Sequence, residues 1–324
     1  MIQSPRIICV GTVTRNRPLM LQVLLDSYAA MTVPADVRLQ FVIIENNTVP
    51  TLFDIIARFQ AEIPEHVVHY ELEPRLGIAF ARNRALDFAL SSEATFLTFA
   101  DDDEVVQADW LVELLAERDV ANLDIVGAPV RLAPMVGISL WKAMLWNGLN
   151  SNMQKNEQKA CTSRNNGQAG RLLIATNSWM GNLEFFRLTG LRFDEGLGLN
   201  GGEDWRLYRE SKKAGAKTGW APQAIVYETI SLERLTLLYQ FRRSRDHCIV
   251  DVRAKLANRG IFTLLRLPGS IAARLLKLAV QLFSMPLSPG RSLVKIASCL
   301  GSIAGMLQAF TNKQSPHYQI TTGN

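Results

Sequence analysis

Residues 96–104 read FLTFADDDE, an apolar run that leads directly into four consecutive acidic side chains. The apolar half has the composition of a short buried strand. Like charges about 4 Å apart repel by roughly 1 to 4 kcal/mol per pair, depending on the local dielectric. A chain tolerates that repulsion on a solvated turn, or at a site where a cation relieves it. The stretch raises both possibilities.

Similar apolar runs occur on both sides of this stretch and are separated by helical patterns. The predicted strands are residues 7–14, 41–44, 67–70, 96–100 and 124–130. Between the strands, apolar residues recur at the three- and four-residue spacing of one helix face, for example after Pro18. This alternation predicts an α/β fold with a doubly wound, mostly parallel sheet that is covered by helices on both faces.

Polar clusters follow three of the predicted strands at the point where each strand ends. They are TVTRNR (12–17), ENN (45–47) and DDDE (101–104). In parallel sheets covered on both faces, ligands bind at the carboxyl ends of the strands. The three clusters therefore predict one ligand site along this edge of the sheet.

The spacing of the acidic run allows two interpretations. Side chains alternate along an extended chain, so Asp101 and Asp103 would point the same way and Asp102 the opposite way. Two carboxylates so placed can face one divalent cation and leave its other positions to water and phosphate oxygens, as for Mg²⁺ beside a nucleotide. The alternative is a solvated acidic turn before the helix that begins near Asp109, where negative charge is favoured.

The chain after residue 130 gives weaker patterns. Residues 131–175 are rich in Asn, Gln, Lys and Ser and are expected to be irregular. A second block begins at residue 176, and its glycines predict a mobile loop that delivers Glu203 and Asp204 to the start of a helix.

Five segments occur in the order, and at the strand ends, expected of one protein family. They are VTRNRP (13–18), VIIENN (42–47), LGIAFARNRAL (76–86), FADDDE (99–104) and GGEDW (201–205). Over residues 5–230 the chain resembles the inverting family-2 glycosyltransferases of bacteria, which have the GT-A fold. The likeness is greatest to transferases that extend lipid-linked repeat units of succinoglycan-type exopolysaccharides.

The resemblance implies a metal-dependent inverting hexosyltransferase. Such an enzyme would move a sugar, expected to be glucose, from a UDP-sugar to a lipid-linked or saccharide acceptor in cell-surface or exopolysaccharide synthesis. Asp101 and Asp103 match the metal-binding DxD motif, with Mn²⁺ or Mg²⁺ as the cofactor. Asp204 matches the catalytic base, and Glu203 beside it would hold the acceptor or orient the loop. Residues expected at the nucleotide sugar are Thr12, Thr14, Arg15, Glu45, Asn46, Arg82, Asn83, Asp101, Asp102 and Asp103.

Three positions depart from the family's pattern. Glu45 stands where the family usually has an Asp that contacts the uracil ring. Tyr227, in IVYET, replaces a His that in many relatives can reach the metal or the diphosphate. The segment QFRRSR (240–245) only loosely resembles the QxxRW motif of processive synthases. Its arginines either contact a diphosphate or an acidic acceptor, or form a basic helix face.

The charge of the chain is unevenly distributed. The net charge is +5, yet nine Lys and Arg residues and no Asp or Glu follow Asp251. In this region apolar residues form one helical stripe from Ile271 to Phe283 and a second from Ile296 to Phe310. Neither reaches the about 20 apolar residues that a membrane span needs. The stripes predict amphipathic helices that lie on the anionic inner face of the cytoplasmic membrane. The alternative is two ordinary helices packed on the catalytic domain.

These patterns divide the chain into a catalytic domain, residues 1–252, and a basic membrane-associating tail, residues 253–324. Within the catalytic domain, 1–130 would bind the nucleotide sugar and 131–252 would supply the acceptor site and the base. A nucleotidyl- or phosphotransferase is a competing interpretation, against which the absence of a Walker A sequence argues. A non-catalytic relative that only binds nucleotide sugar is another. Nucleic-acid binding is not expected, because the tail has too few aromatic residues for a stacking platform.

The remaining features concern the cell compartment. The N-terminal sequence shows no signal-peptide pattern, which predicts a cytoplasmic protein that is peripheral on the membrane. The four cysteines are far apart and form no metal-binding pattern, so they are expected to be reduced.

Overall fold

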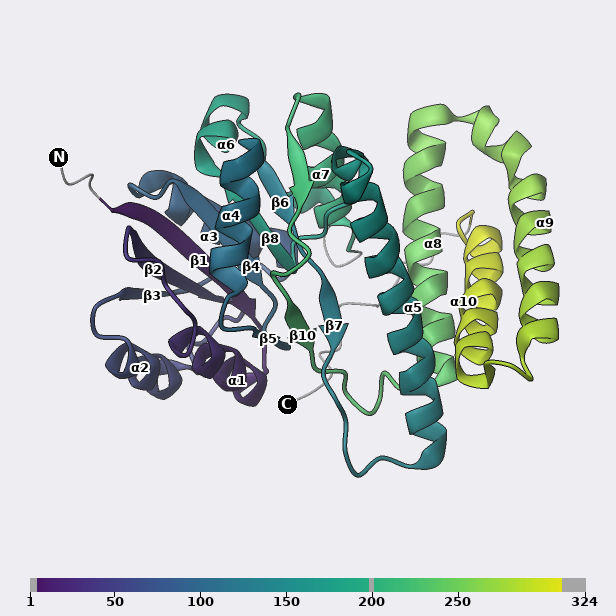
Figure 1. Ribbon diagram of the computed structural model, residues 1–324. Coiled ribbons are helices and arrows are strands. Elements are labelled where there is room, and N and C mark those ends of the chain that lie inside the picture. The colour runs from purple at the N-terminus through teal and green to yellow at the C-terminus, as the bar shows by residue number, and fades with distance from the viewer. Residues whose placement is uncertain (1–4, 198–200, 311–324) are drawn as a thin grey trace.

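The computed structural model (Figure 1) describes residues 5–197 and 201–310, except for the side chains of 257–259. Its centre is a sheet with the strand order β3-β2-β1-β4-β8-β6-β9. These strands are β1 (Arg6–Thr14), β2 (Val37–Glu45), β3 (Val67–Leu72), β4 (Phe96–Ala100), β6 (Ile125–Gly127), β8 (Ser178–Asn182) and β9 (Thr218–Trp220). Only β8 runs antiparallel to its neighbours among the described strands of this sheet. The predicted mostly parallel α/β sheet is confirmed.

Helices cover both faces of the sheet and bury two separate cores. One face carries α1 (Pro18–Ala29), α2 (Phe53–Glu62) and α4 (Trp110–Ala121), and the other carries α3 (Ile78–Ser91), α6 (Leu183–Thr189) and α7 (Glu203–Lys213). Strand residues alternate between the cores: Phe41 and Ile43 lie in the first, Val42 and Ile44 in the second. This alternation explains the continuous apolar runs, because a strand buried on both faces has no polar side.

The predicted strand 124–130 is two strands that belong to different sheets. β6 lies in the large sheet, whereas β7 (Val130–Leu132) joins β5 (Glu104–Val106) and β10 (Val226–Glu228) in a small sheet with the order β5-β10-β7. Pro129 separates them, because it has no N–H to continue the ladder. The prediction of one strand was wrong at this point.

The segment expected to be irregular contains the longest helix of the described chain, α5 (Leu140–Asn165). Two 3-10 turns follow later, η1 (Ala169–Arg171) and η2 (Glu195–Leu197). The pattern of α5 is weak because its apolar stripe, Leu145, Trp146, Leu149 and Met153, is confined to the first half of the helix and the second half is polar. Contacts with other elements, α10 among them, stabilise this helix. The expectation of irregular structure was wrong.

Three helices follow the two sheets: α8 (Leu237–Arg259), α9 (Ile261–Ser284) and α10 (Pro289–Gln308). Figure 1 shows α10 between α8 and α9, and α10 also packs against α5. Its buried face is made of small residues, and a Cβ at Gly301 would lie 2.1 Å from the carbonyl oxygen of Phe241 on α8. The division predicted between 252 and 253 falls inside α8. No helix of the described residues is long and apolar enough to cross a bilayer.

Candidate active site

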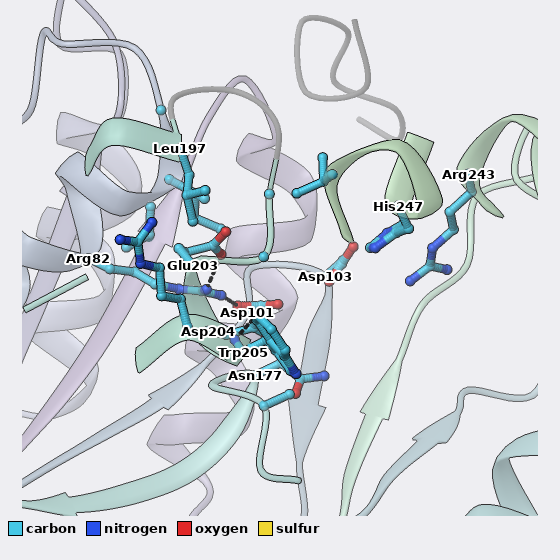
Figure 2. A pocket seen from close by; sticks show the side chains of 18 of the residues that line it. Arg82, Asp101, Asp103, Asn177, Leu197, Glu203, Asp204, Trp205, Arg243 and His247 are labelled. Carbon is cyan, nitrogen blue, oxygen red and sulfur yellow. Dashed lines mark hydrogen bonds and ion pairs between the residues drawn. The ribbon is translucent and has the colours of Figure 1, made fainter. Parts of the chain in front are cut away.

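A cleft of about 870 Å³ lies at the carboxyl edge of the large sheet, as predicted from the polar strand ends. The loop after β1, the acidic run after β4 and the first turns of α7 line it, and residues from β10 and α8 close it on the other side. Figure 2 shows this arrangement, with Arg82 and Glu203 on one side and Arg243 and His247 on the other.

The acidic run is buried, so it is not a solvated turn. The exposed fractions of Asp102, Asp103 and Glu104 are 5%, 9% and 1%. Burial raises the pKa of Asp102 to about 6 and raises the pKa of Asp103 and Glu104 as well. Desolvation disfavours the charged carboxylates, and the neighbouring acids add repulsion. This concentration of negative charge needs cations beside it.

Arg17 supplies one of these cations. Its Nη1 donates to Asp102 Oδ1 at 2.8 Å and to Asp103 Oδ2 at 3.2 Å, and the Thr14 hydroxyl donates to Asp102 Oδ2 at 2.8 Å. The turn that brings Arg17 back over the strand end includes Asn16 at φ 55°, and Asn tolerates this left-handed conformation better than most residues. Arg17 lies in the motif VTRNRP but was not among the residues predicted at the nucleotide sugar.

Arg82 ties the acidic run to α7. Its Nη2 donates to Asp101 Oδ1 at 2.9 Å and its Nη1 to Glu203 Oε1 at 2.7 Å, and both Arg82 and Glu203 are buried. Gly202 precedes Glu203 at φ 89°, a conformation that favours glycine, and it starts α7 so that Glu203 faces Arg82. Glu203 is therefore held in place by its buried ion pair with Arg82.

Arg234 supplies a third cation, which no sequence motif predicted. Its Nη1 lies 3.3 Å from Asp103 Oδ2 and 3.5 Å from Glu228 Oε1. Burial raises the pKa of Glu228, and Asp103 nearby raises it further. The adjacent Tyr227, which replaces the family's His, does not line the cleft, and its hydroxyl accepts from Gln107 Nε2 at 3.3 Å.

Asp204 differs from Asp101, Asp102, Asp103 and Glu203 in making no hydrogen bond to an arginine within the described chain, and it shares this with Glu104, which accepts instead from the N–H of Asp101 and from Asn177 Nδ2. Asp204 Oδ1 accepts the N–H of Trp205 at 2.6 Å, and Asp204 makes no ion pair with any residue in the described ranges. It is half-buried and lines the cleft next to Glu203 (Figure 2). A carboxylate that faces a cleft without a bound cation can accept a proton from a ligand.

The side chains that could bind a divalent cation in the cleft are two carboxylates, which is fewer than a complete ligand set. Asp101 and Asp103 both line the cleft, and carboxylate oxygens suit Mg²⁺ or Mn²⁺. Where the chain is described, no three His, Cys, Asp or Glu side chains are grouped as a metal site. One or two carboxylates are what Mg²⁺ takes from a protein when substrate phosphates complete its coordination. The two aspartates fit such an ion.

The cleft brings together most, but not all, of the residues predicted at the nucleotide sugar. The predicted residues that line it are Thr14, Arg15, Asn46, Arg82, Asp101, Asp102 and Asp103, together with Glu203 and Asp204. Asn46 also shapes it, because its Nδ2 donates to the carbonyls of Glu73 and Arg75 at 2.8 Å and its Oδ1 accepts from Gly77 N–H at 2.9 Å.

Three predicted residues do not line the cleft. Thr12 is fully buried, and its hydroxyl lies 3.2 Å from that of Tyr28. The Glu45 carboxylate is occupied by the local turn, where it accepts from Asn47, from Thr51 and from the hydroxyl of Tyr70. Asn83 bonds the backbone of Phe193 through both ends of its amide. These contacts stabilise the strand ends and turns that surround the cleft.

The order of the sheet, the buried carboxylates at the end of a central strand and the cleft beside them define an α/β protein similar to the GT-A glycosyltransferases. Residues 9–176 match the family model described as Glycosyl transferase family 2, which covers just over half of the chain. The chain belongs to this family.

Three relatives show how far the similarity extends. The succinoglycan biosynthesis protein ExoM of Rhizobium meliloti is 29% identical over 245 residues, which is 74% of this chain and 73% of ExoM. The mannosyltransferase PcManGT of Pyrobaculum calidifontis, solved with GDP-Man and Mn²⁺, has a TM-score of 0.62 at 15% identity, over 97% of this chain and 89% of that one. TarS 1-349 of S. aureus, solved with UDP, has a TM-score of 0.50 at 15% identity, over 93% and 91%. At these identities the solved structures show the fold alone.

Proposed function

We propose that the protein is an inverting glycosyltransferase that moves a hexose, expected to be glucose, from a UDP-sugar to a lipid-linked or saccharide acceptor in exopolysaccharide synthesis. One observation carries the proposal. A single cleft holds a carboxylate cluster balanced by Arg17, Arg82 and Arg234, and beside it Asp204 without an ion pair in the described chain. Membership of the family and the similarity to ExoM support the reaction class and its setting.

On the donor side, the diphosphate would lie against the loop after β1 and the acidic run. A divalent cation on Asp101 and Asp103 would neutralise the charge that develops on the leaving diphosphate. The side chains of Arg15 and Arg17 line the same part of the cleft and would bind phosphate oxygens. The Asp102 carboxylate holds Arg17 in place from behind.

On the acceptor side, Asp204 would remove the proton from the attacking hydroxyl. The oxygen of that hydroxyl forms the new bond to the anomeric carbon, while the bond from that carbon to the diphosphate breaks and UDP departs. Attack from the face opposite the leaving group inverts the anomeric carbon. Glu203 is bound to Arg82 and is assigned a positioning role, since it fixes the first turn of α7 on which Asp204 lies.

We also propose that the helices after residue 252 dock the enzyme on the anionic inner face of the cytoplasmic membrane. The face of α9 that points away from α10 is apolar, and Leu265, Leu276 and Phe283 have exposed fractions of 71%, 68% and 87%. The basic charge of this region, with no acid after Asp251, complements an anionic surface. A lipid-linked acceptor would give this attachment a function.

The test is turnover of a panel of nucleotide sugars by the full-length protein, with Mn²⁺ and with EDTA. We expect binding and slow hydrolysis of a UDP-sugar to UDP and free sugar, both lost in EDTA and restored by Mn²⁺. Unchanged affinity and turnover in EDTA would exclude the metal role. Release of inorganic pyrophosphate would indicate a nucleotidyltransferase, and binding of no nucleotide sugar would reject the proposed function.

A further inference from the structure

A second cavity, of about 470 Å³, lies between α8, α9 and α10. Its principal lining residues are Gln240, Arg243, His247, Asp251, Arg274 and Ser302. Three of these, Arg243, His247 and Asp251, also line the large cleft, so the two spaces adjoin each other. Figure 2 places Arg243 and His247 across the cleft from Arg82 and Glu203, on the side of Asp103.

The cavity concentrates positive charge from two helices. Arg243 comes from α8 and Arg274 from α9, and neither lies within ion-pair distance of a carboxylate in the described chain. Nη1 of Arg274 donates to the carbonyl of Ser270 on its own helix, at 3.1 Å. Asp251 is the one acid of the lining, and its Oδ2 is paired with Lys255 Nζ at 2.6 Å. An anionic ligand would find two guanidinium groups that make no ion pair within the described chain.

Arg274 is placed here by the orientation of α9. Leu267 and Ile271 on the inner side of this helix pack against a small core formed by Cys248, Val252, Met306 and Ala309. Arg274 follows one turn after Ile271 and therefore also faces α8, while Leu275 and Leu276 beside it are exposed on the outer side. One helix thus presents a cation to the cavity and apolar side chains to the surroundings.

We propose that this cavity binds the phosphate or diphosphate group that links the acceptor saccharide to its lipid. The proposal rests on the proposed function, because it gives that reaction's acceptor a second anchoring point. A saccharide held by its phosphate at Arg274 and Arg243 would extend into the adjoining cleft toward Asp204. Its hydrocarbon chain would leave on the side where α9 exposes its leucines.

The experiment measures binding to the full-length protein saturated with UDP, in Mg²⁺ that exceeds all phosphate, so that the donor's diphosphate site is filled. The probes are geranyl diphosphate, geraniol and inorganic pyrophosphate. The variants are Arg274→Gln and Arg266→Gln, which remove the same charge from α9. Arg266 is exposed and does not line the cavity, so it is the matched control.

We expect Arg274→Gln to weaken geranyl diphosphate binding at least tenfold, with geraniol binding, UDP affinity and vesicle flotation unchanged. Arg266→Gln should bind all three probes like the wild type. Equal binding of geranyl diphosphate by both variants would overturn the proposal. So would pyrophosphate binding as tightly as geranyl diphosphate, which would indicate a free-phosphate site, or a loss of vesicle binding confined to Arg274→Gln, which would place Arg274 at the membrane surface. Failure of the wild type to bind UDP would instead reject the proposed function.

Discussion

At the scale of single residues, the site is organised by arginines that fix carboxylates. Arg17 bridges Asp102 and Asp103, and Arg82 bridges Asp101 and Glu203. A buried charge is tolerated only when it is paired, so each of these acids is committed to a partner. Asp204 and Glu104 are neighbouring acids without such a partner in the described chain, and Glu104 is 1% exposed whereas Asp204 is half-buried. This difference supports the proposal that Asp204, rather than Glu203 or Glu104, accepts the proton.

We predict that Asp204→Asn lowers kcat by about 10² to 10⁴-fold with UDP-sugar affinity nearly intact, because the amide keeps the shape but accepts no proton. The comparison variant is Glu203→Gln, which leaves the Arg82 guanidinium with one buried carboxylate fewer. It should lower the stability of the fold as well as turnover. Steady-state kinetics with thermal unfolding of both variants checks this. Near-normal kcat for Asp204→Asn would remove the base role from Asp204.

The sequence predicted the acids of the site but only part of their partners. Asp101, Asp102 and Asp103 stand out because they follow a buried strand, where charge is unexpected without a reason. Arg234 pairs with Asp103 across 131 positions of the chain, and no local pattern indicates such a pair. Thr12 and Glu45 lie at strand ends as predicted, but their side chains are used by the local fold. The direction of a side chain at a strand end depends on the turn that follows, which is a tertiary property.

At the scale of elements, the contrast between α5 and the strands shows what periodicity can detect. The central strands β1, β2 and β4 bury most of their side chains, so their sequences are visibly apolar, whereas the edge strand β3 is only partly buried. α5 packs through Trp146, Leu149 and Met153 in its first half and also by close backbone approach, since a Cβ at Gly148 would lie 2.4 Å from the backbone of Gly290 on α10. Contacts of the second kind need small residues and the second half of the helix is polar, so the periodicity is too short to predict a helix of this length.

The same packing gives a stability prediction for α10. Gly301→Ala would place a Cβ 2.1 Å from the carbonyl oxygen of Phe241 and 3.1 Å from Arg245 N, both backbone atoms that cannot rotate away. We expect a loss of about 1 to 3 kcal/mol in the free energy of unfolding. Gly269→Ala in α9 is the control, because a Cβ there meets no atom within 4 Å and Ala favours the helix by about 1 kcal/mol. Urea unfolding of both variants checks the prediction, and equal stabilities would contradict the packing of α10 on α8.

At the scale of the whole molecule, charge and apolar surface are concentrated in the C-terminal helices. The nine basic residues after Asp251 and the outward leucines of α9 lie in one part of the chain, and the acidic cleft lies in another. The predicted first stripe is divided by the structure, since Ile271 packs inward while Leu275, Leu282 and Phe283 are exposed. A helix that buries no residue fully and exposes its large apolar side chains needs a surface to cover them.

We predict that the full-length protein floats with vesicles that contain anionic lipid and is partly released by high salt. Each Lys or Arg near such a surface contributes about 1 kcal/mol within a Debye length of roughly 8 to 10 Å, whereas buried leucines resist salt. Removing everything after residue 252 is a poor test, because it would delete α10 from its packing on α8 and α5. Leu276→Gln combined with Phe283→Gln changes only exposed positions of α9, so it should reduce flotation without altering thermal stability or UDP-sugar hydrolysis. If the wild type stays in the soluble fraction at low salt, the outer face of α9 does not bind membranes.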